Sequence, residues 1–111
     1  MKERTFYKLV RDLIPDIIRE NGEEAITRVL DDDEYRTELY RKLKEECDEV
    51  LFSSSKEQVL EELADVYEVI SAIASLEGKQ ISDVSLLAEE KRKKRGGFQK
   101  RIFLERTLLR K

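Results

Sequence analysis

Two long stretches of helical periodicity, separated only by Phe52 and the serines Ser53–Ser55, limit the folds open to this chain. They cover about residues 34–51 and 56–76, and the single proline, Pro15, lies before both of them. Because proline and glycine are the residues that most strongly break helices, both stretches can run uninterrupted. A short turn between two helices favours antiparallel packing. The pattern therefore predicts an all-α fold built around a helical hairpin.

Each of these two predicted helices has an apolar face. In the first, Leu39, Leu43 and Val50 lie on one stripe. The second carries an apolar stripe with further apolar residues beside it: Val59, Leu63, Val66, Ile70 and Ile73, flanked by Leu60, Ala64, Tyr67 and Ala74. Its second half, Val66–Leu76, is apolar nearly all round, which indicates burial on more than one side. We therefore expect a four-helix bundle that a second copy of the chain completes.

Local sequence also specifies where the two long helices begin. Asp31–Glu34 supplies acidic side chains that can accept hydrogen bonds from free backbone N–H groups at a helix start. For the second helix, either Ser54 with Glu57 or Ser55 with Gln58 can form a capping box. Both helices are therefore expected to start close to these residues.

The rest of the chain predicts two shorter helices. One covers about Pro15–Glu20, with Asp12 as its N-cap and an Asn-Gly pair at its end. The other covers about Asp83–Arg95, with Ser82 as its N-cap and two glycines at its end.

Apolar residues in and around these shorter helices predict further burial. In the last helix, Val84, Leu87 and Ala88 are expected to face inward. Minor extended or irregular segments are expected at Thr5–Ile14, Ala25–Leu30 and Phe98–Leu104, the last anchored by Phe98, Ile102 and Phe103. At 111 residues, the chain is expected to form a single domain, residues 1–111.

Charge is distributed unevenly along the chain. Its net charge of −3 combines a net −10 over residues 1–88 with a net +7 over residues 89–111. An acidic body with a basic end suits a polyanionic ligand carried with its own divalent cation, although a solvated helix end and tail would give the same pattern. The acidic body and the lack of interleaved aromatic residues argue against binding a nucleic-acid polymer.

Cysteine and histidine content limits the metal chemistry and the cellular compartment. The chain has one cysteine, Cys47, and no histidine, so neither an internal disulfide nor a structural zinc site is expected. A metal site would therefore use carboxylates and favour a hard cation. No apolar run approaches the roughly 20 residues of a membrane span. Together with a charged N-terminus, this predicts a cytoplasmic protein that does not bind membranes.

Carboxylates recur on the two long helices at helical spacing. Glu45, Glu46 and Glu49 form an E-E-x-x-E set, and Glu62 and Asp65 follow as E-x-x-D. Residues three or four apart lie on one helix face, and burying several such carboxylates together is costly unless a cation neutralises them. The sequence therefore predicts a divalent cation between the arms of the hairpin. Solvated carboxylates paired with nearby lysines (Lys42, Lys44 and Lys56) are the alternative.

This acidic pattern resembles the signature of the all-α nucleoside triphosphate pyrophosphohydrolases, the MazG-like superfamily. The opening stretch Tyr7–Pro15 and the closing stretch Lys91–Leu104 are similar to its phosphoribosyl-ATP pyrophosphohydrolase-like branch. The resemblance implies Mg²⁺, replaceable by Mn²⁺, bound by four carboxylates: Glu46, Glu49, Glu62 and Asp65. It also implies a homodimer or tetramer.

The activity implied by the resemblance is cleavage of the α–β phosphoanhydride of a nucleotide, which releases a monophosphate and pyrophosphate. Glu45 and Glu49 are then the candidates for the catalytic base. Basic residues at both ends of the chain are the candidates for binding the substrate phosphates: Lys8, Arg11, Lys91, Lys94 and Arg95. A helical dimerisation module that binds metal and nucleotide without catalysis is the alternative function.

Overall fold

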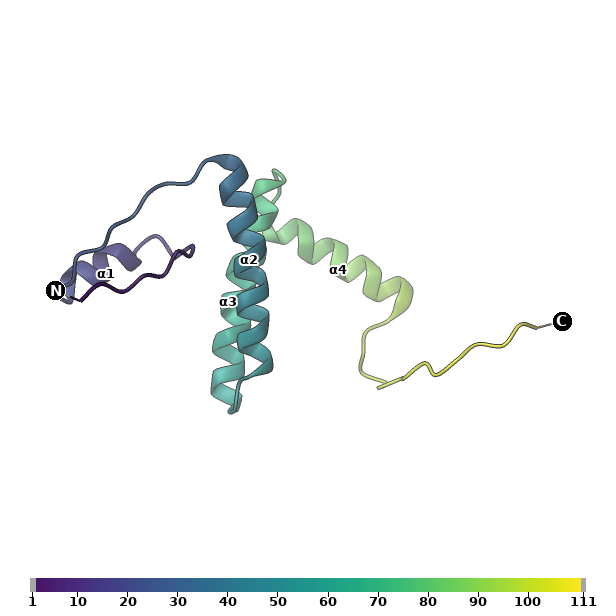
Figure 1. Ribbon diagram of the computed structural model, residues 1–111. Helices are drawn as coiled ribbons and strands as arrows, with labels where there is room; N and C mark the ends of the chain where they lie inside the picture. The colour runs from purple at the N-terminus through teal and green to yellow at the C-terminus, as the bar shows by residue number, and fades with distance from the viewer. Residues whose placement is uncertain (1, 111) are drawn as a thin grey trace. The chain divides into compact units, whose positions relative to one another are not determined.

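The computed structural model describes residues 2–110, which form four α-helices and contain no strand (Figure 1). In chain order these are α1 (Ile14–Glu20), α2 (Asp32–Leu51), α3 (Lys56–Leu76) and α4 (Ile81–Arg95). The prediction of an all-α fold is confirmed. Among the described residues, no helix combines the length and the apolar character needed to cross a membrane.

Side-chain caps set the starts of α2 and α3. The Asp31 carboxylate accepts a hydrogen bond from the backbone N–H of Glu34 at 2.8 Å, so α2 begins two residues before the predicted position. The Ser55 hydroxyl accepts from the N–H of Gln58 at 3.1 Å, and the Gln58 side chain accepts from the N–H of Ser54 at 3.0 Å. The second of the two predicted capping pairs is therefore the one that forms, and the bounds predicted for this helix are confirmed.

A glycine in the left-handed conformation ends α3. Gly78 has φ +72°, its N–H donates to the carbonyl of Ser75, and the N–H of Lys79 donates to the carbonyl of Ala74. These are the two hydrogen bonds of a Schellman motif, which glycine accommodates without steric cost. Gly22 ends α1 in the same way, with φ +85°.

The packed core lies between α2 and α3, which run side by side (Figure 1). Its buried apolar residues among those described are Leu39, Val69 and Ala74. The expected core stripe of α3 is partly wrong: Leu63, which was expected in the core, is 46% exposed, and Val69, which was not, is buried. The stripe that faces α2 passes through Glu62, so it is displaced around the helix from the one that apolar spacing favours.

The segment before α2 differs from prediction at the start of α1. Asp12 does not cap α1: Leu13 is the N-cap residue and its side chain makes no capping hydrogen bond, because the helix begins one residue earlier than expected, with Pro15 in its first turn. Residues 25–30 lie in no helix or strand, in agreement with the irregular segment expected there. Among the described residues, α1 packs against neither α2 nor α3.

The chain divides into two compact units, the first ending at Ile81 and the second beginning at Ser82. Helix α4 starts at Ile81, the last residue of the first unit, so Ser82 lies in its first turn and is not its N-cap. The expectation that apolar residues of α4 face inward is wrong, because no residue of this helix is buried and its side chains at 84, 87 and 88 are exposed. The expected anchors Phe98, Ile102 and Phe103 are exposed as well.

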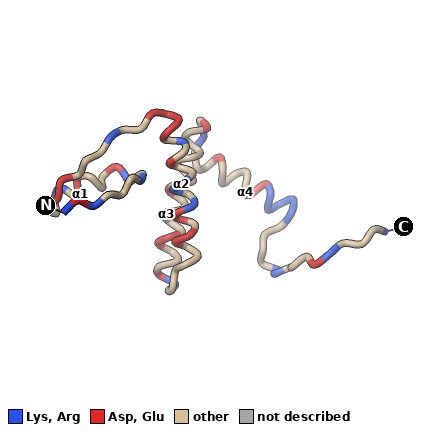
Figure 2. The backbone as a smooth tube through the Cα atoms, viewed as in Figure 1, with Lys and Arg blue, Asp and Glu red and all other residues tan. Residues whose placement is uncertain are grey.

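These corrections share a physical cause. A side chain is buried only where a neighbouring element covers it, and residues 82–110 contain a single helix followed by irregular chain. Basic residues gather toward the C-terminal end of α4, where they complement the negative end of the helix dipole (Figure 2).

Candidate metal centre

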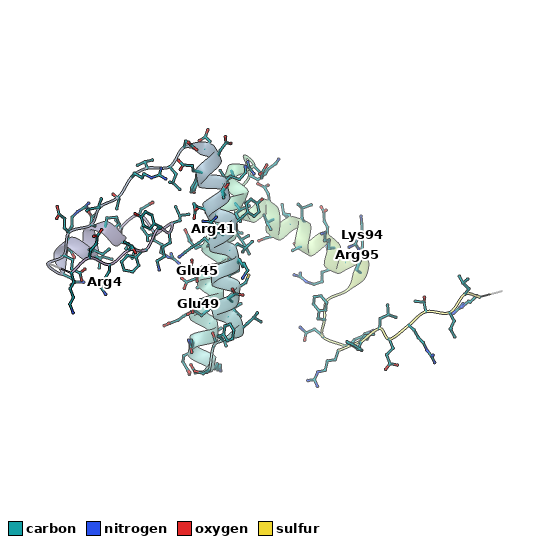
Figure 3. The ribbon with its side chains drawn as sticks, viewed as in Figure 1. Arg4, Arg41, Glu45, Glu49, Lys94 and Arg95 are labelled. Carbon is teal, nitrogen blue, oxygen red and sulfur yellow. The ribbon has the colours of Figure 1, made fainter. Side chains whose placement is uncertain are left out.

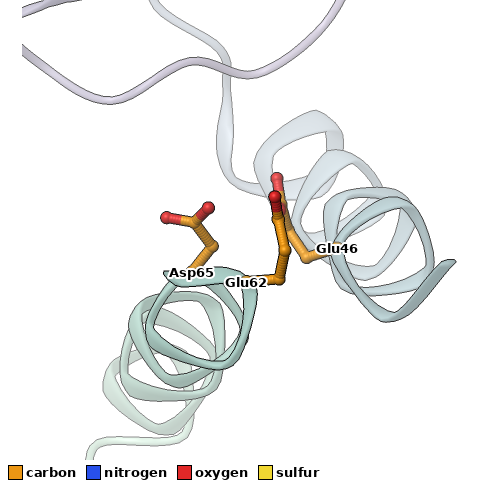
Figure 4. A group of neighbouring side chains, drawn as sticks. All are labelled: Glu46, Glu62 and Asp65. Atoms are coloured by element: carbon orange, nitrogen blue, oxygen red, sulfur yellow. The ribbon is translucent and has the colours of Figure 1, made fainter. Parts of the chain in front are cut away.

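Three carboxylates from α2 and α3 converge on one side of the hairpin. One oxygen each from Glu46, Glu62 and Asp65 lie within 4.8 Å of one another. Figure 4 shows the three side chains projecting the same way, Glu46 from α2 and the other two from α3. Glu62 and Asp65 share a face because they are three residues apart on a helix, and the serine turn brings α2 alongside them. The structure therefore brings together three of the four carboxylates expected to bind a cation.

This arrangement is costly for a protein without a counter-ion. Glu46 is buried, with only 8% of its surface exposed, at a position where apolar spacing calls for a core residue. Partial burial raises the pKa of the Glu62 carboxyl above its ordinary value, and the nearby carboxylates of Glu49 and Asp65 raise the pKa further. Glu62 forms no ion pair with any described residue. Packing alone does not account for three carboxylates at this point.

Two basic side chains partly neutralise the cluster. The Lys42 Nζ lies 3.3 Å from an oxygen of Glu46 and 3.4 Å from one of Glu45, one helical turn along α2. The Arg11 guanidinium donates to Asp65 Oδ1 at 2.7 Å from the segment that precedes α1. Pairing of the carboxylates with a nearby lysine is the alternative to a bound cation that the sequence analysis gives. No sequence pattern predicts the contact between Arg11 and Asp65.

The geometry of the three carboxylates fits a hard divalent cation. Two oxygens bound to one octahedral Mg²⁺ lie about 3.0 Å apart when adjacent and about 4.2 Å apart when opposite, given bonds of about 2.1 Å. A spread of up to 4.8 Å therefore needs only small rotations of the side chains to bring all three oxygens within reach. Glu62 and Asp65 are only partly buried, which leaves room for water or ligand oxygens at the remaining positions.

The other two predicted acidic residues, Glu45 and Glu49, lie on α2, which also carries Glu46 (Figure 3). Glu49 is exposed and outside the group of three, yet its carboxylate is close enough to raise the pKa of Glu62. Glu45 is half-buried and pairs with Lys42. Their roles as a fourth ligand and as a base stay predictions.

The five predicted phosphate-binding residues fall into different parts of the chain. Arg11 reaches the carboxylate cluster directly. Lys8 is exposed, with its Nζ 5.7 Å from the centre of the Phe6 ring. Lys91, Lys94 and Arg95 lie on α4 in the second unit, outside the unit that holds the carboxylates (Figure 3).

Comparison with known proteins adds one relative. An uncharacterized protein from Mycolicibacterium smegmatis is 43% identical over 54 residues, which is 49% of this chain. The chain spans about half of that protein, since the match covers 55% of its length. No family model matches the chain. No solved structure matches it either.

Proposed function

We propose that this protein is a Mg²⁺-dependent nucleotide pyrophosphohydrolase of the MazG-like, phosphoribosyl-ATP pyrophosphohydrolase-like type. It would cleave the α–β phosphoanhydride of a nucleoside triphosphate or of phosphoribosyl-ATP to a monophosphate and pyrophosphate. The observation that carries the proposal is the convergence of Glu46, Glu62 and Asp65 from two helices, with Glu46 buried. The E-E-x-x-E and E-x-x-D spacing supports it.

The side chains have separate roles in this proposal. Glu46, Glu62 and Asp65, with Glu49 from the next turn of α2, would hold Mg²⁺ or Mn²⁺. When bound, the cation supplies charge neutralisation and polarisation of the phosphate oxygens. Glu45 or Glu49 would accept the proton of the attacking water, because Glu49 acts electrostatically on Glu62 and Glu45 shares Lys42 with Glu46.

Assembly into a dimer or tetramer is part of the same proposal. Leu60, Leu63 and Tyr67 lie at helical spacing on α3, and about half of the surface of each is exposed in the single chain. A second copy that covers this face would complete a four-helix core from two hairpins. The lone, exposed thiol of Cys47 suits a reducing compartment, and we place the protein in the cytoplasm.

Pyrophosphate release from a panel of nucleoside triphosphates and phosphoribosyl-ATP, each with Mg²⁺, tests the activity. The variant Asp65→Asn keeps the shape of a ligand but removes its charge, and it should lower turnover by more than about 100-fold, the upper range for residues that only support a metal ligand. Asp48→Asn is the matched control, because Asp48 is also a helical carboxylate in an ion pair, with Lys44, but lies outside the cluster. Equal turnover by Asp65→Asn and the parent would reject the catalytic assignment.

A helical dimerisation module that binds metal and nucleotide without catalysis is the second candidate. The carboxylate cluster and the neighbouring Arg11 could bind a cation and a phosphate whether or not a water is activated there. Mg²⁺-dependent nucleotide binding with no pyrophosphate released from any panel member would establish this alternative.

A further inference from the structure

The contact between Arg11 and Asp65 joins two residues that are 54 positions apart in the sequence. The Arg11 Nη2 lies 2.7 Å from Asp65 Oδ1, and both side chains are partly exposed. Asp65 also belongs to the group of three carboxylates whose oxygens converge. Arg11 therefore places a permanent positive charge at the edge of the candidate metal centre.

Such a charge has opposite effects on the affinities of the two ligands that the proposed function requires, the divalent cation and the phosphate. A guanidinium beside a carboxylate opposes the binding of a second cation there, because the two positive charges repel each other. It favours a phosphate, which guanidinium groups bind through paired N–H donors. The same residue thus weakens binding of the cation alone and strengthens binding of a phosphate ligand.

The location of Arg11 allows it to exchange partners. It belongs to an irregular segment ahead of α1, and an ion pair between partly exposed groups contributes little to folding. Lys42, by contrast, is held beside Glu45 and Glu46 by the geometry of a single helix. Arg11 can therefore turn from a carboxylate to a phosphate without unpacking the hairpin.

We propose that Arg11 couples the two binding events: it is the counter-ion of Asp65 in the absence of ligand and a phosphate contact once ligand is present. This inference rests on the proposed function, because it assigns a regulatory role at the same site. Its consequence is that the site favours a cation arriving with a polyphosphate over the free cation.

Titration calorimetry with two probes tests the coupling: Mg²⁺ alone, and inorganic pyrophosphate at saturating Mg²⁺. In Arg11→Gln, Mg²⁺ should bind about five- to tenfold more tightly, the effect of one neighbouring charge at a partly exposed site. Pyrophosphate should bind about tenfold or more weakly in the same variant. Arg4→Gln is the matched control, because Arg4 lies in the same segment and pairs at 3.0 Å with Glu23, which is not one of the three clustered carboxylates.

Arg11→Lys is the second variant, and it keeps the inference testable if Arg11→Gln does not fold, as circular dichroism would reveal. It retains the charge but not the fork of donors, so Mg²⁺ affinity should stay within about twofold of the parent while pyrophosphate affinity falls several-fold. A variant at Arg11 that weakens both ligands, or changes neither, overturns the coupling while the proposed function stands. If the parent binds Mg²⁺ neither alone nor together with pyrophosphate, both the proposed function and the coupling are rejected.

Discussion

Paired truncations in the hairpin, Leu39→Ala and Leu63→Ala, would reveal whether a second copy covers α3. Leu39 is buried, with 3% of its surface exposed, and its truncation should cost about 3 kcal/mol of unfolding free energy from lost burial and the cavity left behind. Leu63 is 46% exposed in the single chain. The groups that Leu63→Ala removes have a transfer free energy of roughly 2.4 kcal/mol, and burial in the single chain realises only about half of it. An isolated chain should therefore lose only about 1 kcal/mol on Leu63→Ala. If a partner buries this face, the loss rises to about 3 kcal/mol per chain and matches that of Leu39→Ala.

Urea unfolding at several protein concentrations distinguishes these cases. Folding coupled to dimerisation makes the midpoint rise with concentration, because each tenfold dilution costs about 1.4 kcal/mol per mole of dimer. We expect this dependence in the parent, and a large cost for both variants. A loss near 1 kcal/mol for Leu63→Ala, with a midpoint that does not move with concentration, would refute the covered face. Light scattering on the parent gives an independent mass for comparison with the 13.1 kDa chain.

Two further predictions concern the helix start and the carboxylate cluster. Ser55→Ala removes the hydroxyl that accepts from the N–H of Gln58, and urea unfolding should show a loss of about 1 kcal/mol; no loss would mean that the cap contributes nothing. The pKa of Glu62 in the folded protein is raised above its ordinary value of 4.5. Between these two pKa values the folded protein binds a proton at Glu62 more readily than the unfolded chain does. The free energy of unfolding of the metal-free protein should therefore fall as the pH rises from 4.5 through the raised pKa. Thermal melts should show this fall in the parent and its absence in Glu62→Gln, and added Mg²⁺ should reverse it; identical pH profiles for the two proteins would contradict the assignment.

Helix positions were predictable because their determinants are local. Both bounds of α3, Lys56–Leu76, follow from a serine cap at one end and a glycine shortly after the other, and each acts through residues within one or two turns. The inward face of this helix was not predictable in the same way. The second half of α3 is apolar nearly all round, so the spacing of its apolar residues does not distinguish one stripe from the next. Packing against α2 determines that the stripe containing Val69 is buried.

The candidate site likewise combines residues that local spacing predicts with a contact that depends on the tertiary structure. Glu62 and Asp65 were identified because their spacing of three residues places them on one face, and Glu46 because it interrupts an apolar stripe. The ion pair of Arg11 with Asp65 depends on the path of an irregular segment, which no periodic pattern encodes. Sequence reasoning selected Arg11 for its charge and assigned it to phosphate, which left its carboxylate partner unidentified.

The lone cysteine of α2 gives this molecule a built-in position for spectroscopy. Cys47 follows Glu46 directly and is exposed. Successive side chains on a helix point about 100° apart, so a nitroxide attached to Cys47 would lie near the carboxylates without entering among them. Paramagnetic Mn²⁺ held by those carboxylates would broaden the nitroxide spectrum, and diamagnetic Mg²⁺ would leave it sharp. Occupancy of the centre could thus be followed on the native sequence, with no residue replaced.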